Sequence, residues 1–187
     1  MKQWLNDGNG GAMHPTVEAT WKMIETATAG MSPEDLARHP EGKWCTAEVV
    51  EHLLITYTAT TAGLRKVLAK GAAQGTAPTL KNRLAQFVVL DAGHFPAGRK
   101  APEMTIPKGL DPAQVVRAVS QALADMDAAI TECEKNYGKV KIADHPVLGP
   151  LTATQWRKFH FVHARHHMKQ VERLKALASP ARARASA

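Results

Sequence analysis

Four of the nine histidines of this chain lie within eight positions near its end. They are His160, His163, His166 and His167. A neutral imidazole nitrogen binds transition metals, and imidazole also exchanges protons near neutral pH. Two imidazoles at positions i and i+4 of a helix have Cβ atoms ~5–6 Å apart, so both can bind one ion at ~2.0–2.1 Å. This segment therefore predicts half of a metal site.

A helical projection at about 100° per residue indicates which of these histidines face the core. The apolar residues of the segment form one stripe, with His163 and His167 on either side of its centre, His160 inside it and His166 at its edge. The pair His163 and His167 is therefore preferred, while the i, i+3 pairs His160/His163 and His163/His166 stay open as rivals. If no metal binds, the buried histidines need other hydrogen-bond partners. The opposite face carries the basic residues Arg157, Lys158, Arg165, Lys169 and Lys175.

The third ligand must come from another helix, and His52 is the candidate because it lies near the start of a long apolar stretch. Glu48 precedes it by four residues and shares its face, which permits a contact with the histidine or a general-base role. The alternative for Glu48 is a capping box with Cys45 or Thr46. Cys45 lies about 10.5 Å of helical rise from His52 and cannot share its metal. It is also far in sequence from Cys133, so neither a disulfide framework nor a thiolate zinc cage is indicated.

Start and stop signals predict four long helices that would position these residues. Asp111 can cap a helix that begins at Pro112, and Thr152 with Gln155 forms a second predicted capping box. The predicted helices run from Thr16 to Gly30, from Trp44 to Gly71, from Asp111 to Asn136 and from Thr152 to Ala178.

The connections contain shorter predicted elements. Ser32-Pro33 predicts a short helix, Leu80–Leu90 a short segment of helix or irregular structure, and Gly93–Gly109 a long loop. No β-alternation is strong enough to predict a sheet. The sequence thus predicts an all-α protein, a four-helix bundle with a crossover segment after the second helix. We expect one domain over residues 1–178 and a disordered basic tail over 179–187.

The composition is typical of one globular domain: 187 residues, 44% of them hydrophobic and 22% charged. No stretch approaches the ~18–20 apolar residues of a membrane span, and residues 1–13 lack the apolar run of a signal peptide. We therefore expect a cytoplasmic protein with no membrane partner. The net charge of +7 leaves anionic partners open, but no nucleic-acid-binding motif is present, and we do not expect nucleic acid as a partner.

The candidate residues also match the pattern of a known family. The motifs are Trp-x-x-x-Glu-x-x-x-His at Trp44, Glu48 and His52, and His-x-x-x-His followed by Gln at His163, His167 and Gln170. In order and spacing, the chain resembles the DinB/YfiT-like superfamily of metal-binding four-helix bundles from about Thr16 to Leu177. The segment 145–152 is similar to a largely uncharacterised branch of that superfamily.

The resemblance implies an up-down-down-up bundle in which His52, His163 and His167 hold a divalent metal, zinc or nickel. Relatives often form homodimers, and some are transferases or isomerases that use a low-molecular-weight thiol. The expected function is therefore a divalent-metal-dependent enzyme acting on a small-molecule substrate, either a thiol-dependent transferase or a metal-assisted hydrolase, in which Glu48 or His160 handles a proton. The alternative is a non-catalytic bundle that binds a metal or a small ligand.

Overall fold

The structure is a computed structural model that describes residues 12–185 except positions 97 and 99, and side chains only as far as position 176. The N-terminal residues in which we expected no signal peptide lie almost wholly outside this range. The side chains of the predicted basic tail, 179–187, lie outside it as well.

Most of the described chain is helical, which confirms the predicted all-α class. The helices are α1 (Pro15–Thr28), α2 (Pro33–Ala37), α3 (Thr46–Lys70), α4 (Leu80–Gln86), α5 (Pro112–Tyr137) and α6 (Ala153–Ala185). A π-helical turn, η1 (Phe87–Asp91), follows α4, and a 3₁₀ turn, η2 (Glu103–Thr105), lies in the long loop before α5. Two short strands, β1 (Ala143–His145) and β2 (Gly149–Leu151), precede α6.

Side-chain caps fix the starts of the two helices that carry the candidate ligands. At the start of α3, the Cys45 sulfur accepts a hydrogen bond from the Glu48 amide at 3.5 Å, and the Glu48 carboxylate accepts one from the Cys45 amide at 2.9 Å. At the start of α6, Thr152 and Gln155 exchange the same two kinds of hydrogen bond. Both helices therefore begin within two residues of the predicted starts at Trp44 and Thr152.

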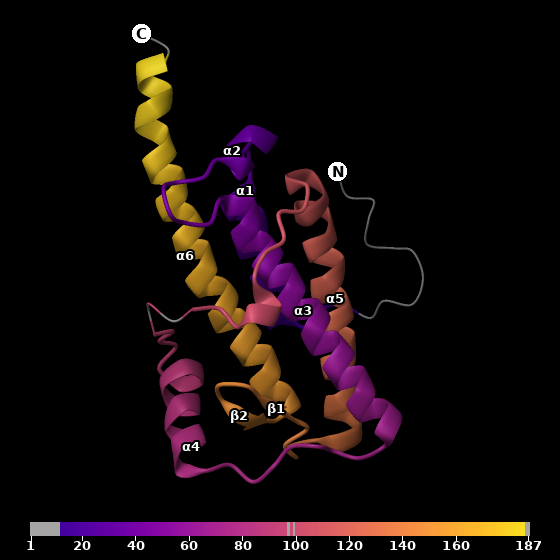
Figure 1. The fold of residues 1–187 in the computed structure, drawn as a ribbon. Helices are drawn as coiled ribbons and strands as arrows, with labels where there is room; N and C mark the ends of the chain where they lie inside the picture. Colours follow the sequence, from indigo (N-terminus) through magenta and orange to yellow (C-terminus); the bar gives the residue numbers. More distant parts are fainter. Residues whose placement is uncertain (1–11, 97, 99, 186–187) are drawn as a thin grey trace.

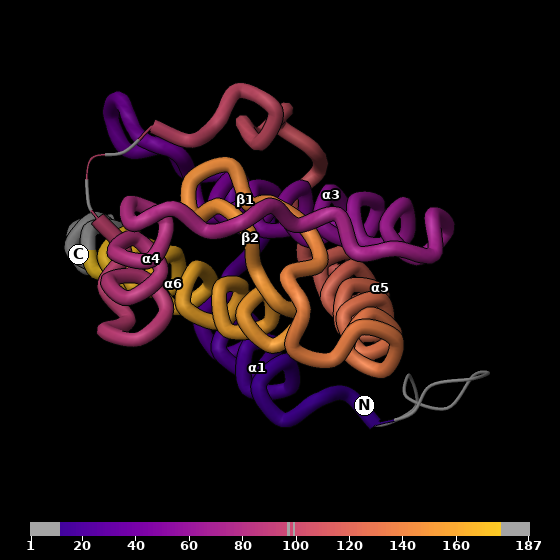
Figure 2. The backbone as a smooth tube through the Cα atoms, turned by 90° about the horizontal axis from the view of Figure 1, so that it is seen from below, coloured from indigo at the N-terminus to yellow at the C-terminus, as the bar shows by residue number. Residues whose placement is uncertain are grey.

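Two helix pairs form the body of the molecule. α3 packs along α5, α1 packs along α6, and α6 also contacts α3 and α5 (Figure 1). Figure 2 shows these helices grouped together, with the hairpin across one end and α4 to one side. The core between them is built from fully buried aliphatic side chains such as Ile24, Leu53, Leu123 and Ile130. Burying each such side chain contributes about 1.5–3 kcal/mol, which holds α1, α3 and α5 together around one core.

The β-hairpin escaped the sequence prediction because strands of three residues are too short to show a two-residue alternation. The strands pair antiparallel, with Ala143 opposite Leu151. The buried Gln86 amide donates to the carbonyls of Leu148 and Pro150 at 2.9 and 3.0 Å. The hairpin is thus tied to the end of α4 by a side chain rather than by a larger sheet.

The last helix is longer than predicted. The sequence predicted an end near Ala178, before Pro180, whereas α6 is described as far as Ala185. A proline inside a helix removes one amide donor and disfavours the helix locally, yet the helical backbone here continues on both sides of it.

Arg157 is buried, which corrects the prediction that it lies on the solvent-facing side of the last helix. Its side chain is only 3% exposed, with Nε 3.1 Å from the Asp127 carboxylate and Nη1 2.9 Å from the Glu134 carboxylate. Nη2 donates to the Thr131 hydroxyl at 3.0 Å. Because α5 packs against this side of α6 and supplies all three acceptors, the guanidinium is paired where the projection of a single helix expected water.

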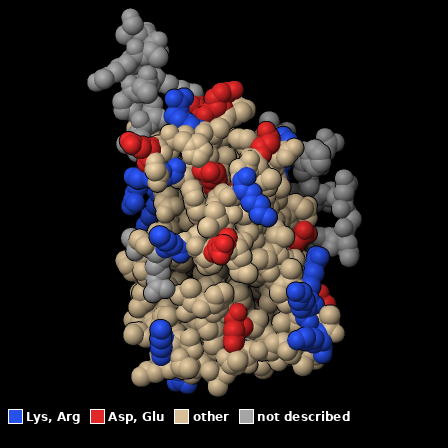
Figure 3. Space-filling model, in the orientation of Figure 1, with Lys and Arg blue, Asp and Glu red and all other residues tan. Residues whose placement is uncertain are grey.

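The charged side chains do not segregate by sign on the face shown in Figure 3, where Lys and Arg lie among Asp and Glu. The sequence as a whole carries 24 basic and 17 acidic residues. Within the part of the chain that the structure describes, no helix is both long and apolar enough to cross a membrane.

Candidate metal centre

Three buried histidines meet between α3 and α6. His52 lies in the second turn of α3, and His163 and His167 occupy successive turns of α6. Nε2 of His163 lies 3.2 Å from Nε2 of His52 and 2.9 Å from Nε2 of His167. Each ring offers one ligand atom to a group whose members all lie within 4.8 Å of one another. The structure thus brings together the three residues that the sequence singled out as ligands.

The two outer rings are oriented by hydrogen bonds at their other nitrogens. Nδ1 of His52 lies 2.7 Å from the carbonyl oxygen of Thr105, which can only accept, so this Nδ1 carries the proton. Nδ1 of His167 likewise donates to the side-chain oxygen of Gln170 at 2.8 Å, while the Gln170 nitrogen donates to His166 at 3.2 Å. Since a neutral imidazole has one ring proton, Nε2 of His52 and of His167 each presents a lone pair to the centre.

The number of protons at the centre does not match the number of close contacts. Nε2 of His163 has at most one hydrogen and can donate to only one of its two neighbours. At least one of these two close contacts therefore has no hydrogen between its nitrogens, and the lone pair of His52 or His167 there faces Nε2 of His163 without a donor. A cation between the three nitrogens would relieve this repulsion, and neutral imidazoles are ligands that zinc and nickel accept.

Protonation of the histidines does not readily supply the positive charge instead of a metal ion, because burial disfavours a charged imidazole. Burial, followed by the proximity of His167 and His52, lowers the pKa of His163 well below its usual range. Burial also lowers the pKa of His167 to about 3 and is the main cause that lowers the pKa of His52. All three rings are therefore neutral at pH 7, the form in which imidazole binds a metal.

The separations of His163 Nε2 from the other two Nε2 atoms are close to those required by a tetrahedral ion. Two nitrogens bound at ~2.0–2.1 Å lie about 3.3–3.4 Å apart at a tetrahedral angle. The separations of 3.2 and 2.9 Å are shorter by a few tenths of an ångström, which small ring rotations would correct. The residues present therefore fit a divalent ion held by three histidines, with at least one coordination position left for another ligand.

Aromatic side chains border the three rings. The Trp44 indole lies 5.3 Å from the His52 ring, and the Phe95 ring lies 5.3 Å from the His163 ring, measured between centroids. Such apolar neighbours limit the access of water and lower the local dielectric. Sequence reasoning missed both Phe95 and Thr105, because they lie in the long loop between η1 and α5, where no periodic pattern assigns residues to a site.

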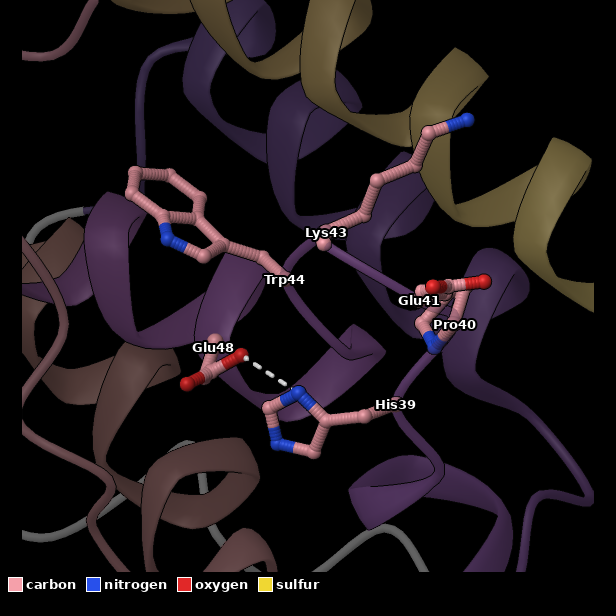
Figure 4. A pocket seen from close by; sticks show the side chains of 7 residues that line it. His39, Pro40, Glu41, Lys43, Trp44 and Glu48 are labelled. Carbon is pink, nitrogen blue, oxygen red and sulfur yellow. Dashed lines mark ion pairs between the residues drawn. The ribbon is translucent and has the colours of Figure 1, made fainter.

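Glu48, one of the two residues predicted to handle a proton, is engaged at the start of α3. Beyond its capping box with Cys45, its carboxylate lies 3.5 Å from Nδ1 of the exposed His39 (Figure 4). These residues also form a second group of ligand-type atoms, at the edge of an open surface pocket of about 470 Å³ that Trp44 helps to line. Helix capping accounts for both Cys45 and Glu48 here, and the general-base role of Glu48 stays a prediction.

His160, the other residue predicted to handle a proton, is buried one turn before His163. Its Nε2 lies 3.0 Å from the hydroxyl oxygen of Thr60 and its ring packs against Tyr57, while its Nδ1 has no hydrogen-bond partner among the residues that the structure describes. It does not belong to the group of three converging histidines. The structure thus favours the pair His163/His167 over the rival i, i+3 pairs.

Fold and site together define a mostly helical protein with a buried three-histidine cluster between two of its long helices. The chain belongs to the family described as "Protein of unknown function (DUF1569)", whose model matches residues 26–174. This range includes all three histidines of the cluster. A search of curated proteins and a search of solved structures each found no match.

The buried histidines predict that the metal-free protein loses stability in acid. Burial lowers the pKa of His145 to about 4 and the pKa of His160 to about 3, from an ordinary value of 6.5. Near pH 5 the unfolded chain binds these two protons and the folded chain does not. The free energy of unfolding should therefore be fully present above about pH 6.5. These two residues alone should lower it by about 2.7 kcal/mol per pH unit near pH 5, and His163 and His167 should add to this slope.

Urea unfolding of the protein in a chelating buffer, at a series of pH values between about 4.5 and 7, measures this slope. The variant His160→Gln retains a group that can bond to Thr60 but does not titrate. Its free energy of unfolding should therefore change less steeply with pH than that of the wild type, by the contribution of about one proton. A free energy of unfolding that stays constant between pH 7 and pH 5 would show that these histidines are not neutral in the folded state.

Proposed function

We propose that this protein is a divalent-metal-dependent enzyme in which His52, His163 and His167 hold zinc or nickel. The observation that carries the proposal is the convergence of three Nε2 atoms, at least two of which present lone pairs. The reaction class that fits such a centre is a thiol-dependent transfer or a metal-assisted hydrolysis on a small-molecule substrate. Both classes need an ion with an open coordination position.

The finer description of the fold belongs to the same proposal. We assign this chain to the DinB/YfiT-like up-down-down-up four-helix bundles. The support is that α1, α3, α5 and α6 are its longest helices, that α4 and η1 form a crossover after α3, and that the histidines fall on α3 and α6 in the order of that superfamily. A low-molecular-weight thiol as cosubstrate and a homodimer remain predictions from the resemblance.

The protein's own residues would prepare the centre for this chemistry. Thr105 and Gln170 hold the proton on Nδ1 of His52 and His167, which leaves both Nε2 atoms free as ligands. An ion bound there would supply Lewis acidity and lower the pKa of a coordinated water or thiol. Glu48 bonds to Cys45 and His160 bonds to Thr60, and for both residues a role in proton transfer stays a prediction.

The metal content of untagged protein tests the proposal. Elemental mass spectrometry should find about one zinc or nickel per chain, and the variant His52→Ala should lose it while circular dichroism shows the same helix content. A polyhistidine tag must be absent because it binds the same metals. A folded wild-type protein that stays free of metal after reconstitution with zinc and with nickel would contradict the proposal.

Turnover assays then separate the enzyme from a binding protein. The metal-loaded protein should turn over at least one substrate in a panel of thiol acceptors, esters and amides, and His52→Ala should not. Metal binding at full stoichiometry without turnover across the panel would favour the non-catalytic metal-binding bundle.

A further inference from the structure

A buried carboxylate directly precedes the α3 histidine of the centre. Glu51 is 1% exposed, and its two oxygens accept hydrogen bonds from the backbone amides of Lys108, Gly109 and Leu110 at 2.8, 3.0 and 3.1 Å. A carboxylate this deeply buried is usually paired with a cationic side chain. Here three successive backbone amides donate to it, so the loop is shaped around the carboxylate.

The same loop orients the neighbouring histidine. Thr105, three residues before Lys108, supplies the carbonyl that accepts from Nδ1 of His52 at 2.7 Å. Thr105 is buried, although its neighbours Met104 and Ile106 are exposed. Two successive residues of α3 thus contact the same loop. The Glu51 carboxylate accepts from the amides of residues 108–110, and the His52 imidazole donates to the carbonyl of residue 105.

We propose that Glu51 is a positioning residue for the metal centre. By holding the amides of residues 108–110, it keeps the Thr105 carbonyl against His52, which keeps the ring proton on Nδ1 and directs Nε2 toward His163. Hydrogen bonds to an ionised carboxylate are stronger than those between neutral groups, so this contact holds the loop more firmly than the single bond at Thr105 does. The inference rests on the proposed function only in taking the oriented ring to be a metal ligand.

The chemistry of the side chain explains which substitutions test this role. Glutamine has the same length as Glu51 but only one acceptor oxygen, and its NH₂ group would face at least one of the three amides as a second donor. Glu51→Gln should therefore release part of the loop with little change in volume. Asp127 offers a matched control, because it is also a buried carboxylate and accepts from the His14 amide and from Arg157.

The first experiment needs no metal. Nitrogen-15 NMR of the histidine rings in metal-free protein should show His52 protonated at Nδ1 in the wild type and in Asp127→Asn. In Glu51→Gln the His52 signals should move toward the Nε2-protonated or averaged form. A folded Glu51→Gln protein whose His52 signals equal those of the wild type would overturn the inference. Should Glu51→Gln fail to fold, Glu51→Asp, which keeps the charge on a shorter side chain, gives the same readout.

The second experiment measures the affinity for Zn²⁺ by competition with a chromophoric chelator. Glu51→Gln should bind about 10–100-fold more weakly than the wild type, whereas Asp127→Asn should stay within about twofold. Equal affinities of Glu51→Gln and the wild type would also overturn the inference. If the wild type itself binds neither zinc nor nickel, the proposed function fails, and the NMR comparison still decides whether Glu51 orients His52.

Discussion

Replacing His163 or His167 with alanine is expected to weaken Zn²⁺ binding by more than about 100-fold, whereas His166→Ala should weaken it by no more than about tenfold. His163 and His167 each contribute an Nε2 atom to the converging group. His166 is not a member of that group: its ring packs edge-on against His167 at 5.2 Å between centroids, and Gln170 donates to it while accepting from His167. Competition titration of the three variants under identical conditions measures the difference.

His166→Ala is the matched control for this comparison because it removes the same side chain from the same helix, one residue away from a ligand. All three variants should keep the helix content of the wild type. Equal losses of affinity in the three variants would show that the register of α6 differs from the one described. Full affinity in His167→Ala would remove the i, i+4 pair from the centre.

The variant Arg157→Met is expected to lower the free energy of unfolding by about 3–5 kcal/mol, because it leaves the buried Asp127 carboxylate without its cation. The Arg157 side chain is 3% exposed and the Asp127 side chain 7%, so little water can replace the lost contact. The long methionine side chain keeps most of the packing volume. Urea unfolding at pH 7 in a chelating buffer measures the effect on the protein alone.

Lys158→Met is the control for Arg157→Met, since Lys158 follows it in sequence and also forms an ion pair. Its amine lies 2.8 Å from the Asp91 carboxylate, but the two side chains are 48% and 58% exposed. Exposed pairs of this kind contribute about 0–1 kcal/mol. A similar loss in both variants would contradict the burial of Arg157 between α5 and α6.

Local signals were sufficient to predict the helix starts. The Asp111 carboxylate accepts from the Gln114 amide at the start of α5, Ser32 caps α2, and Thr152 caps α6. Each of these caps involves residues three positions apart, so a short window of sequence contains the whole interaction. The helical projection of the last helix also predicted correctly that His160, His163 and His167 are buried. The apolar stripe of that one helix is sufficient to define which of its sides faces the core.

Features that depend on distant residues could not be predicted in this way. The pairing of Arg157 with Asp127 and Glu134 requires knowing which side of α6 meets α5. The hydrogen bond from His52 to Thr105 joins residues 53 positions apart, through a loop that has no periodic pattern. The sequence therefore indicated three candidate ligands, but not the loop and the buried carboxylate that orient one of them.

The placement of the histidines on α3 and α6 also sets an order of events during synthesis. His52 and His163 are 111 positions apart, so a nascent chain contains only one member of the cluster until α6 is made. A single imidazole is a weak ligand, and the incomplete chain offers an ion no preformed site. Loading would therefore follow the docking of α6, and the ion would act as a late cross-link between two folded helices rather than as a nucleus for folding.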